Sequence, residues 1–298
     1  MKKRSTNLQL FRFIATALVI NWHSFTLTGN SVEWEPLYRL THGHLGMWHV
    51  GFYFLFLVAG YFAVTGVKRK PEGYLSARWK RIYPALWVTV ILSLLLGAVV
   101  TTLPQAGYWM NPKTWLYLLN ALMVPIHGLP GVFAGHPHGD AVNGALWTLP
   151  VEFIGYVGIW LFWKLKLLEK KPMLLLTPVV AAATVLLVMY GSRFGIRFIM
   201  VYPVAAFFLG ALFATLEWKI PWLCFGCPVQ VPEWMAKPGD ITYEMYLMGF
   251  PIQQCIVEFA PELSQFAHFI VAMLIDTTLA FLLHFLLIKL HKKRSGKK

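Results

Sequence analysis

Residues 8–25 read LQLFRFIATALVINWHSF, an apolar run that contains two ionisable side chains, Arg12 and His23. A run of this length and composition predicts a membrane-spanning helix. Eleven positions separate Arg12 from His23, and on a helix eleven steps of about 100° complete three turns plus about 20°. The two side chains are therefore expected on one helix face, roughly 16 Å apart along the axis.

Similar apolar runs recur along the whole chain. Of its 298 residues, 57% are hydrophobic and only 13% are charged, with a mean hydropathy of +0.57, whereas a soluble domain carries about twice that share of charge. We therefore expect an all-α, polytopic integral membrane helical bundle with about eight to ten transmembrane helices. Residues 115–126 are too short for a full span and are interpreted as re-entrant or interfacial. The eight clearest spans are residues 8–28, 45–66, 82–103, 145–163, 173–190, 197–216, 241–258 and 265–288.

Lysine and arginine indicate the orientation in the membrane. The net charge is +13, but the cations lie in short clusters between apolar runs and not on one polar surface, so we expect no nucleic-acid partner. With the N-terminus inside, the inside segments hold 21 Lys and Arg residues and the outside segments hold 4, which predicts cytoplasmic N- and C-termini. The sequence has no signal-peptide cleavage pattern and no long polar stretch. Residues 1–298 are therefore expected to form a single membrane domain with no separate soluble domain.

Ionisable side chains inside a bilayer are costly and usually mark a polar pathway or an active site. Arg12, near the cytoplasmic end of its helix, has the planar paired donors that bind phosphate. His23, deeper in the membrane, could remove a proton from a hydroxyl as a general base. The alternative is structural: Arg12 would reach lipid phosphates, and His23 would be a hydrogen-bonded packing residue.

Two further clusters place charge at or within the membrane. Arg78 and Arg81 are three residues apart, neighbours on one helix face, and with Lys80 they could bind an anion such as a nucleotide phosphate. The alternative is that they are ordinary cytoplasmic anchors. Glu152 falls within an apolar helix, where a carboxylate needs a partner. It could orient His23 or bind a polar acceptor, or it could pair with an Arg or Tyr for structural reasons.

Aromatic and histidine side chains are candidates for a site on the outer side. Trp147 and Tyr156 could wall a sugar-sized site or lie at the membrane interface. His136 and His138, in the loop sequence GHPHGD, could bind the acceptor or belong to an ordinary polar loop; a metal site is disfavoured because the loop lacks a fixed ligand spacing. The CxxC at residues 224–227 has no second half that would complete a zinc site, so we expect no metal.

Five sequence blocks follow one another from residue 8 to about residue 251. They are the Arg and His of the first helix, with ten residues between them, and residues 51–62 (GFYFLFLVAGYF), 78–84 (RWKRIYP), 146–152 (LWTLPVE) and 239–251 (GDITYEMYLMGFP). Together these blocks resemble the acyltransferase-3 family of integral membrane acyltransferases, whose patterns include R-x10-H and an R-x-x-R before Y-P. The chain departs from the family pattern at Ala59, where Ser is usual, and at Gly249, where His is frequent.

The resemblance implies a membrane O-acyltransferase that moves an acyl group, commonly acetyl, from cytoplasmic acyl-CoA to a hydroxyl of an extracytoplasmic glycan or lipid-linked glycan. It implies a bacterial-type inner membrane, acetyl-CoA as a substrate, and no permanently bound cofactor. His23 would be the catalytic histidine, supported by Glu152, while Arg12, Arg78 and Arg81 would bind the donor. The rival interpretation is a membrane transporter or lipid-linked-glycan flippase, because intramembrane charges serve those proteins equally well.

Overall fold

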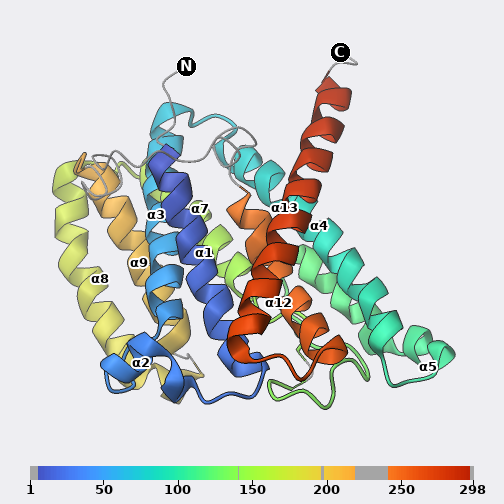
Figure 1. The fold of residues 1–298 in the computed structure, drawn as a ribbon. Helices are drawn as coiled ribbons and strands as arrows, with labels where there is room; N and C mark the ends of the chain where they lie inside the picture. The colour runs from blue at the N-terminus through green and yellow to red at the C-terminus, as the bar shows by residue number, and fades with distance from the viewer. Residues whose placement is uncertain (1–5, 140, 196–197, 219–240, 296–298) are drawn as a thin grey trace.

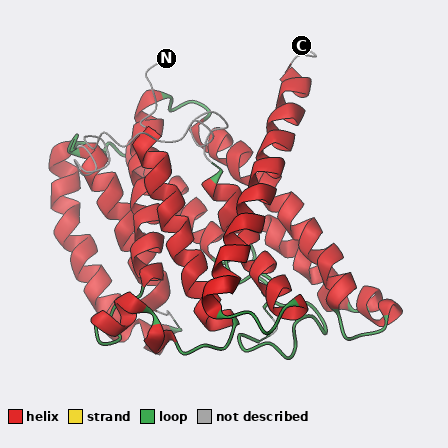
Figure 2. Ribbon diagram, in the orientation of Figure 1, coloured by secondary structure: helices red, strands yellow, loops and turns green. Residues whose placement is uncertain are grey.

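The computed structural model describes residues 6–139, 141–195, 198–218 and 241–295. Within these ranges every regular element is a helix, and the only strand-like feature is an isolated bridge between Gly128 and Ala141. Figure 2 shows the resulting all-helical bundle. The predicted fold class, a helical membrane bundle, is confirmed.

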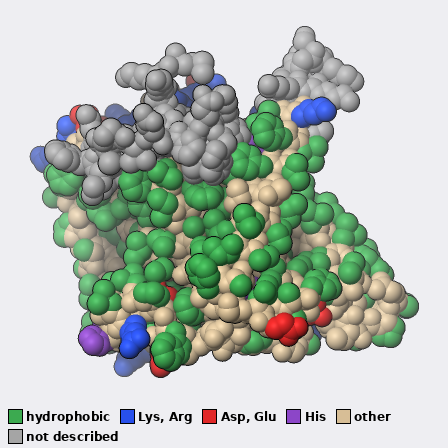
Figure 3. All heavy atoms as spheres, in the orientation of Figure 1, with side chains coloured by type: hydrophobic (Ala, Val, Ile, Leu, Met, Phe, Trp, Pro, Cys, Tyr) green, Lys and Arg blue, Asp and Glu red, His purple; other side chains and the backbone are tan. Residues whose placement is uncertain are grey.

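Each predicted span falls on a long helix. The helices are α1 (Thr6–Leu27), α3 (Met47–Arg69), α4 (Tyr74–Val100), α7 (Thr148–Lys164), α8 (Lys170–Tyr190), α9 (Phe198–Thr215), α12 (Thr242–Phe259) and α13 (Gln265–Ser295). Five of them, α1, α3, α4, α8 and α13, are long and apolar enough to cross a membrane by length and composition. Figure 3 shows hydrophobic side chains over the middle of the bundle and charged side chains toward its two ends. This distribution matches a bundle whose middle lies in lipid.

The sequence predicts that residues 115–126 are too short to span the membrane, and they do not form a long helix. They contain the end of α6 (Pro112–Leu116) and the 3₁₀ turn η2 (Tyr117–Leu122). The turn ends at Met123, which has a left-handed φ of 61°. The Asn120 side chain then bonds both backbone groups of Ile126, at 2.8 Å and 2.9 Å, so the chain turns back without leaving polar groups unpaired. The other short helices are η1 (Val32–Trp34), α2 (Pro36–Leu40), α5 (Gln105–Met110) and η3 (Gly191–Phe194).

Glycines allow α3 and α9 to pack with their backbones in contact. A Cβ on Gly60 would collide with the carbonyl oxygen of Phe207, and a Cβ on Gly210 would collide with that of Leu57. Small residues permit such close crossings between membrane helices. In Figure 1, α3 lies between α1 and α9, α13 lies against α12, and α8 lies at the edge of the bundle next to α9.

An asparagine compensates for a proline in the middle of α12. Pro251 has no N–H, so the carbonyl of Leu247, four residues earlier, loses its helical hydrogen-bond donor. The buried Asn143 side chain donates to that carbonyl instead, at 2.8 Å. The Oδ1 of Asn143 also accepts from the N–H of Ala145 at 3.0 Å. Asn143 therefore ties the segment before α7 to the middle of α12.

The start of α1 and the end of α13 lie at the same end of the bundle, which we call the inner end (Figure 1). The helix α2 lies at the opposite, outer end. The loop containing His136 is also at the outer end, because His136 contacts Glu258 near the end of α12. The arrangement agrees with the predicted placement of both chain ends on one side of the membrane.

Candidate functional site

The residues expected to bind an anion share one cavity toward the inner end of the bundle. Arg12 reaches it from α1, Arg78 and Arg81 from α4, and Glu152 and Tyr156 from α7. The cavity has a volume of about 70 Å³, room for one small group and not for a whole nucleotide. Three guanidinium groups face one carboxylate in its lining, so the site favours an anion. We call it the arginine cavity.

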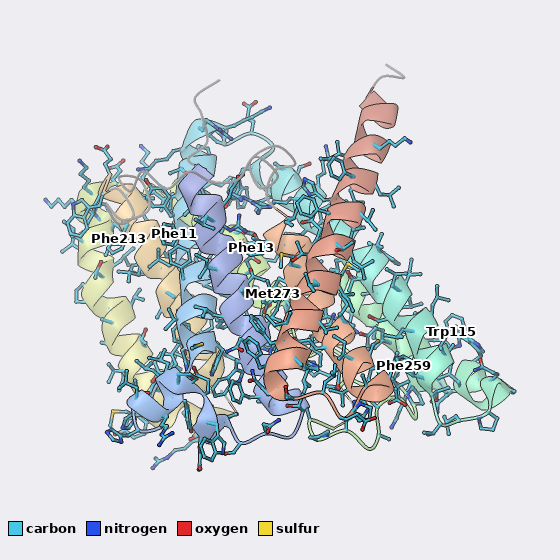
Figure 4. The ribbon with its side chains drawn as sticks, viewed as in Figure 1. Phe11, Phe13, Trp115, Phe213, Phe259 and Met273 are labelled. Carbon is cyan, nitrogen blue, oxygen red and sulfur yellow. The ribbon has the colours of Figure 1, made fainter. Side chains whose placement is uncertain are left out.

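Arg12 is aimed by its two neighbours on α1. Figure 4 shows Phe11 and Phe13 on opposite sides of the helix. Phe11 packs against Phe54 of α3, with ring centroids 6.4 Å apart, and Phe13 packs into a cluster formed with α12 and α13. The side chain between them is left to project into the arginine cavity.

Arg78 is fixed in place by contacts on several sides. Its Nη2 donates to the carbonyl of Phe62 at 2.6 Å, and its guanidinium lies over the rings of Tyr156 at 4.7 Å and Tyr74 at 5.2 Å. Gly66 leaves the space that the guanidinium fills, because a Cβ there would lie 2.8 Å from Nη2. A guanidinium has five N–H donors, so most of them remain for a ligand.

Glu152 and Tyr156 form the α7 wall of the arginine cavity. They are one helical turn apart, and the Tyr156 hydroxyl donates to the Glu152 carboxylate. The same carboxylate interacts electrostatically with Arg12. The sequence interpretation placed Tyr156 with the acceptor, but the structure puts it among the arginines. Glu152 likewise lies with the arginines and lines their cavity, where it partly balances their charge.

Two tyrosines of α12, Tyr243 and Tyr246, complete the cavity; both lie in the family-like block at residues 239–251, which was given no role in the sequence interpretation. Tyr243 donates its hydroxyl to the carbonyl of Ile82 at 3.1 Å, and Tyr246 donates to Thr148 Oγ1 at 2.9 Å. Both tyrosines and Thr148 line the arginine cavity. Their hydrogen bonds join α12 to α4 and to the start of α7 around the charged groups.

His23 lies farther along the continuous helix α1, on the same side as Arg12. It is not among the described residues that line the arginine cavity. Its ring meets the ring of Phe250 on α12 edge-on, with centroids 5.1 Å apart. Gln253, one turn farther along α12, lies beside the His23 side chain. The arginine cavity and His23 are thus separate in the structure: α12 contacts the cavity through Tyr246 and the histidine through Phe250.

A buried polar network surrounds Gln253. Its amide nitrogen donates to the Ile20 carbonyl and to Ser24 Oγ, both at 2.9 Å. His268 of α13 contacts Ser24 Oγ at 3.0 Å and the Gln253 carbonyl at 3.1 Å. Both amide hydrogens of Gln253 are therefore used, and its Oε1 remains to accept from the His23 ring. Such a bond would select which ring nitrogen carries the proton.

At the outer end, His136 lies between two acceptors. Its Nδ1 is 2.8 Å from Gln254 Oε1, and its Nε2 is 2.8 Å from Glu258 Oε2. Gln254 uses its amide nitrogen to donate to the Ala141 carbonyl, so its oxygen faces the imidazole. Both ring nitrogens of His136 therefore lie within hydrogen-bond distance of an oxygen. His138 lies nearby, with its ring 5.7 Å from that of Phe250.

His136 and Glu258 line a second cavity of about 460 Å³, which we call the outer cavity. His268 and Thr28 also line it, and each contacts Ser24, one residue from His23. Trp147 packs against Phe52 of α3, at 5.8 Å between ring centroids, as part of the core. It is not among the described residues that line either cavity.

Other ionisable residues within the helices have different surroundings. Glu244 pairs with His284 of α13 at 2.8 Å. Asp276 is fully buried beside Gly249, and neither carboxylate oxygen has a hydrogen-bond partner among the described residues. In the described part of the chain there is no group of three or more His, Cys, Asp or Glu side chains that could hold a metal ion. The CxxC at residues 224–227 lies outside the described residues.

The fold and the charged cavity together define an integral membrane protein with an arginine-lined cavity inside its helical bundle. A family model described as "Acyltransferase domain", that of the acyltransferase-3 family, matches residues 5–223. The chain belongs to this family and is a membrane acyltransferase. Searches among curated proteins and among solved structures returned no significant match. The matched region contains α1, α4 and α7, whereas the α12 residues described above lie beyond it.

Proposed function

We propose that this protein transfers an acetyl group from cytoplasmic acetyl-CoA to a hydroxyl of an extracytoplasmic glycan, and that it resides in a bacterial-type inner membrane. The observation that carries the proposal is the arginine cavity at the inner end, with His23 farther toward the outer end on the same side of α1. Acyl-CoA is a substrate in this scheme, and the whole chain acts as one membrane domain.

The arginine cavity would hold one anionic group of the donor. Arg78 is already fixed by Phe62 and Tyr156, so few degrees of freedom are lost when its free N–H groups bind a phosphate. The cavity is too small for the nucleotide part of coenzyme A, which would remain at the inner end. For the thioester to reach His23, roughly 16 Å along α1 from Arg12, the packing between the arginine cavity and His23 would have to open to admit the flexible arm of coenzyme A.

His23 would act as the general base on the acceptor hydroxyl. It takes the hydroxyl proton as the oxygen attacks the thioester carbonyl carbon; the carbon–sulfur bond then breaks, and the thiolate leaves and accepts a proton. Gln253 Oε1 would hold the N–H of the imidazole, which leaves the other ring nitrogen free to take the proton. Gln253 is thus a positioning residue, and His23 is the group that touches the reacting atoms.

Proteoliposomes loaded with radiolabelled acetyl-CoA, with glycan acceptors outside, test the proposal. We expect ester-linked label on the glycan with the native protein, none with His23→Ala, and a normal amount with His44→Ala, because His44 is an exposed histidine of the outer loops. Gln253→Met should lower the rate about 10-fold to 100-fold without weakening donor binding.

Donor binding provides a folding control for these variants. Purified His23→Ala protein should still gain thermal stability from acetyl-CoA, since a ligand at 100 times its Kd stabilises the folded state by about 2.7 kcal/mol. Full transfer by His23→Ala would contradict the catalytic assignment. A native protein that gains no stability from millimolar acetyl-CoA would contradict the donor assignment.

A further inference from the structure

An apolar groove runs along the seam between α4 and α12 in the outer half of the bundle. Its α4 wall is formed by residues 89, 92, 93 and 96, which follow the i, i+3, i+4, i+7 spacing of one helix face. Its α12 wall extends from Met248 to Phe259, about 16 Å of helix. The groove has a volume of about 520 Å³.

The groove opens sideways, toward the lipid. Leu92 and Phe259 on its rims are 46% and 69% exposed, and Ile275 of α13 is 40% exposed. Figure 4 shows Phe259 at the end of α12 that lies near α4. A groove with this lining and this opening can admit a hydrocarbon chain directly from the bilayer.

At its outer end the groove continues into the outer cavity. Ala260 lines both, and Val100, one turn beyond Leu96 on α4, lines the outer cavity. The lining changes there from apolar side chains to the paired His136 and Glu258. The combined site is therefore amphipathic, with its polar end adjacent to the network around His23.

We propose that the acceptor is a glycolipid, with its hydrocarbon chain in the α4–α12 groove and its sugar in the outer cavity. This inference rests on the proposed function. A water-soluble sugar would occupy only the outer cavity, whereas a lipid-linked sugar occupies both parts of the site. No Lys or Arg occurs among the described residues that line the outer cavity, and His136 is in contact with the Glu258 carboxylate. The site therefore favours an uncharged link between chain and sugar over a pyrophosphate link.

Three acceptors that carry the same sugar test this inference. They are the free oligosaccharide, a long-chain alkyl glycoside, and the sugar joined to the same chain through a pyrophosphate. With the native protein we expect transfer to the alkyl glycoside to be fastest. Equal transfer to the free oligosaccharide would overturn the role of the chain, and faster transfer to the pyrophosphate compound would overturn the uncharged link. No transfer to any of the three would count against the proposed function itself.

Filling the groove should affect only the lipid-linked acceptor. Cys255, a free thiol on the α12 wall, offers a matched pair of variants. Cys255→Trp should lower transfer to the alkyl glycoside at least about tenfold and leave transfer to the free oligosaccharide and stabilisation by acetyl-CoA unchanged. Cys255→Ala should leave all three unchanged. Equal loss for both acceptors, or no loss for the alkyl glycoside, would overturn the inference.

Photo-crosslinking gives a readout that does not depend on turnover. An alkyl glycoside with a diazirine in its chain should label peptides containing residues 89–96 and 248–259. The helix α8 is the internal control, because only 6% of its span is buried and it lies at the edge of the bundle. Labelling of α8 as strong as that of the groove peptides would overturn the inference.

Discussion

Removal of the Asn143 side chain tests how the proline in α12 is stabilised. Asn143 makes two buried hydrogen bonds, one to the Leu247 carbonyl that Pro251 leaves without a donor and one from the N–H of Ala145. An unsatisfied buried backbone group costs about 1–3 kcal/mol. Asn143→Ala is therefore expected to lower the free energy of unfolding by about 2–5 kcal/mol, with the cavity left by the amide included.

A second substitution separates this explanation from a general loss of packing. Pro251→Ala restores an N–H that can donate to the Leu247 carbonyl within the helix. In that background Asn143→Ala no longer leaves the carbonyl unpaired, so its cost should fall by about 1–2 kcal/mol. The two substitutions should thus be non-additive, with the double variant more stable than the sum of the single effects indicates.

Equilibrium unfolding in mixed micelles, with increasing denaturing detergent, measures these quantities through the fluorescence of the 13 tryptophans. The four proteins of the cycle are compared at a fixed lipid-to-protein ratio. Additivity within about 0.3 kcal/mol would refute the reasoning, because it would mean that the Asn143 amide does not substitute for the missing N–H of Pro251.

Two further predictions concern donor binding and helix packing. Arg78→Ala should raise the Kd for coenzyme A about 10-fold to 100-fold through loss of charge-assisted hydrogen bonds. The control is Lys80→Ala, which removes an exposed cation of α4 outside the described cavity lining and should change the Kd about twofold or less. Equal effects of the two substitutions in calorimetric titration would show that only the overall charge matters. Gly60→Ala should destabilise the protein by about 1–3 kcal/mol by forcing α3 away from α9, while Gly158→Ala, whose Cβ meets no atom within 4 Å, should stabilise it slightly. A Gly60→Ala protein as stable as the native one in thermal unfolding would rule out the close contact.

The fold was largely predictable because a membrane-spanning helix is encoded locally. Each of the eight apolar runs became a long helix, whereas the short run at 115–126 formed only the end of α6 and the 3₁₀ turn η2. The three arginines were also predicted to act together, and the structure brings them to one cavity. In each case the signal was the residue type within a short window of sequence, where helix geometry alone decides the outcome.

Partners that are distant in sequence could not be predicted. The spacing of Arg12 and His23 gave their common face correctly, but it did not show that α12 presents tyrosines at one level and Phe250 at the other. The contact between Gln253 and Ile20 joins residues 233 positions apart. Tyr156 was placed with the acceptor because an aromatic side chain in an apolar helix carries no signal of what it faces. Only the packing of the helices determines such contacts.

The helix α12 meets three different partners in succession: the arginine cavity at Tyr246, His23 at Phe250, and His136 at Glu258. Inserting or deleting one residue within it would rotate everything beyond that point by about 100° and shift it by about 1.5 Å. All contacts on one side of the change would be lost together. Little of the peripheral α8 is buried, so its register is less constrained, and differences in helix length among related chains should accumulate there and be absent from α12.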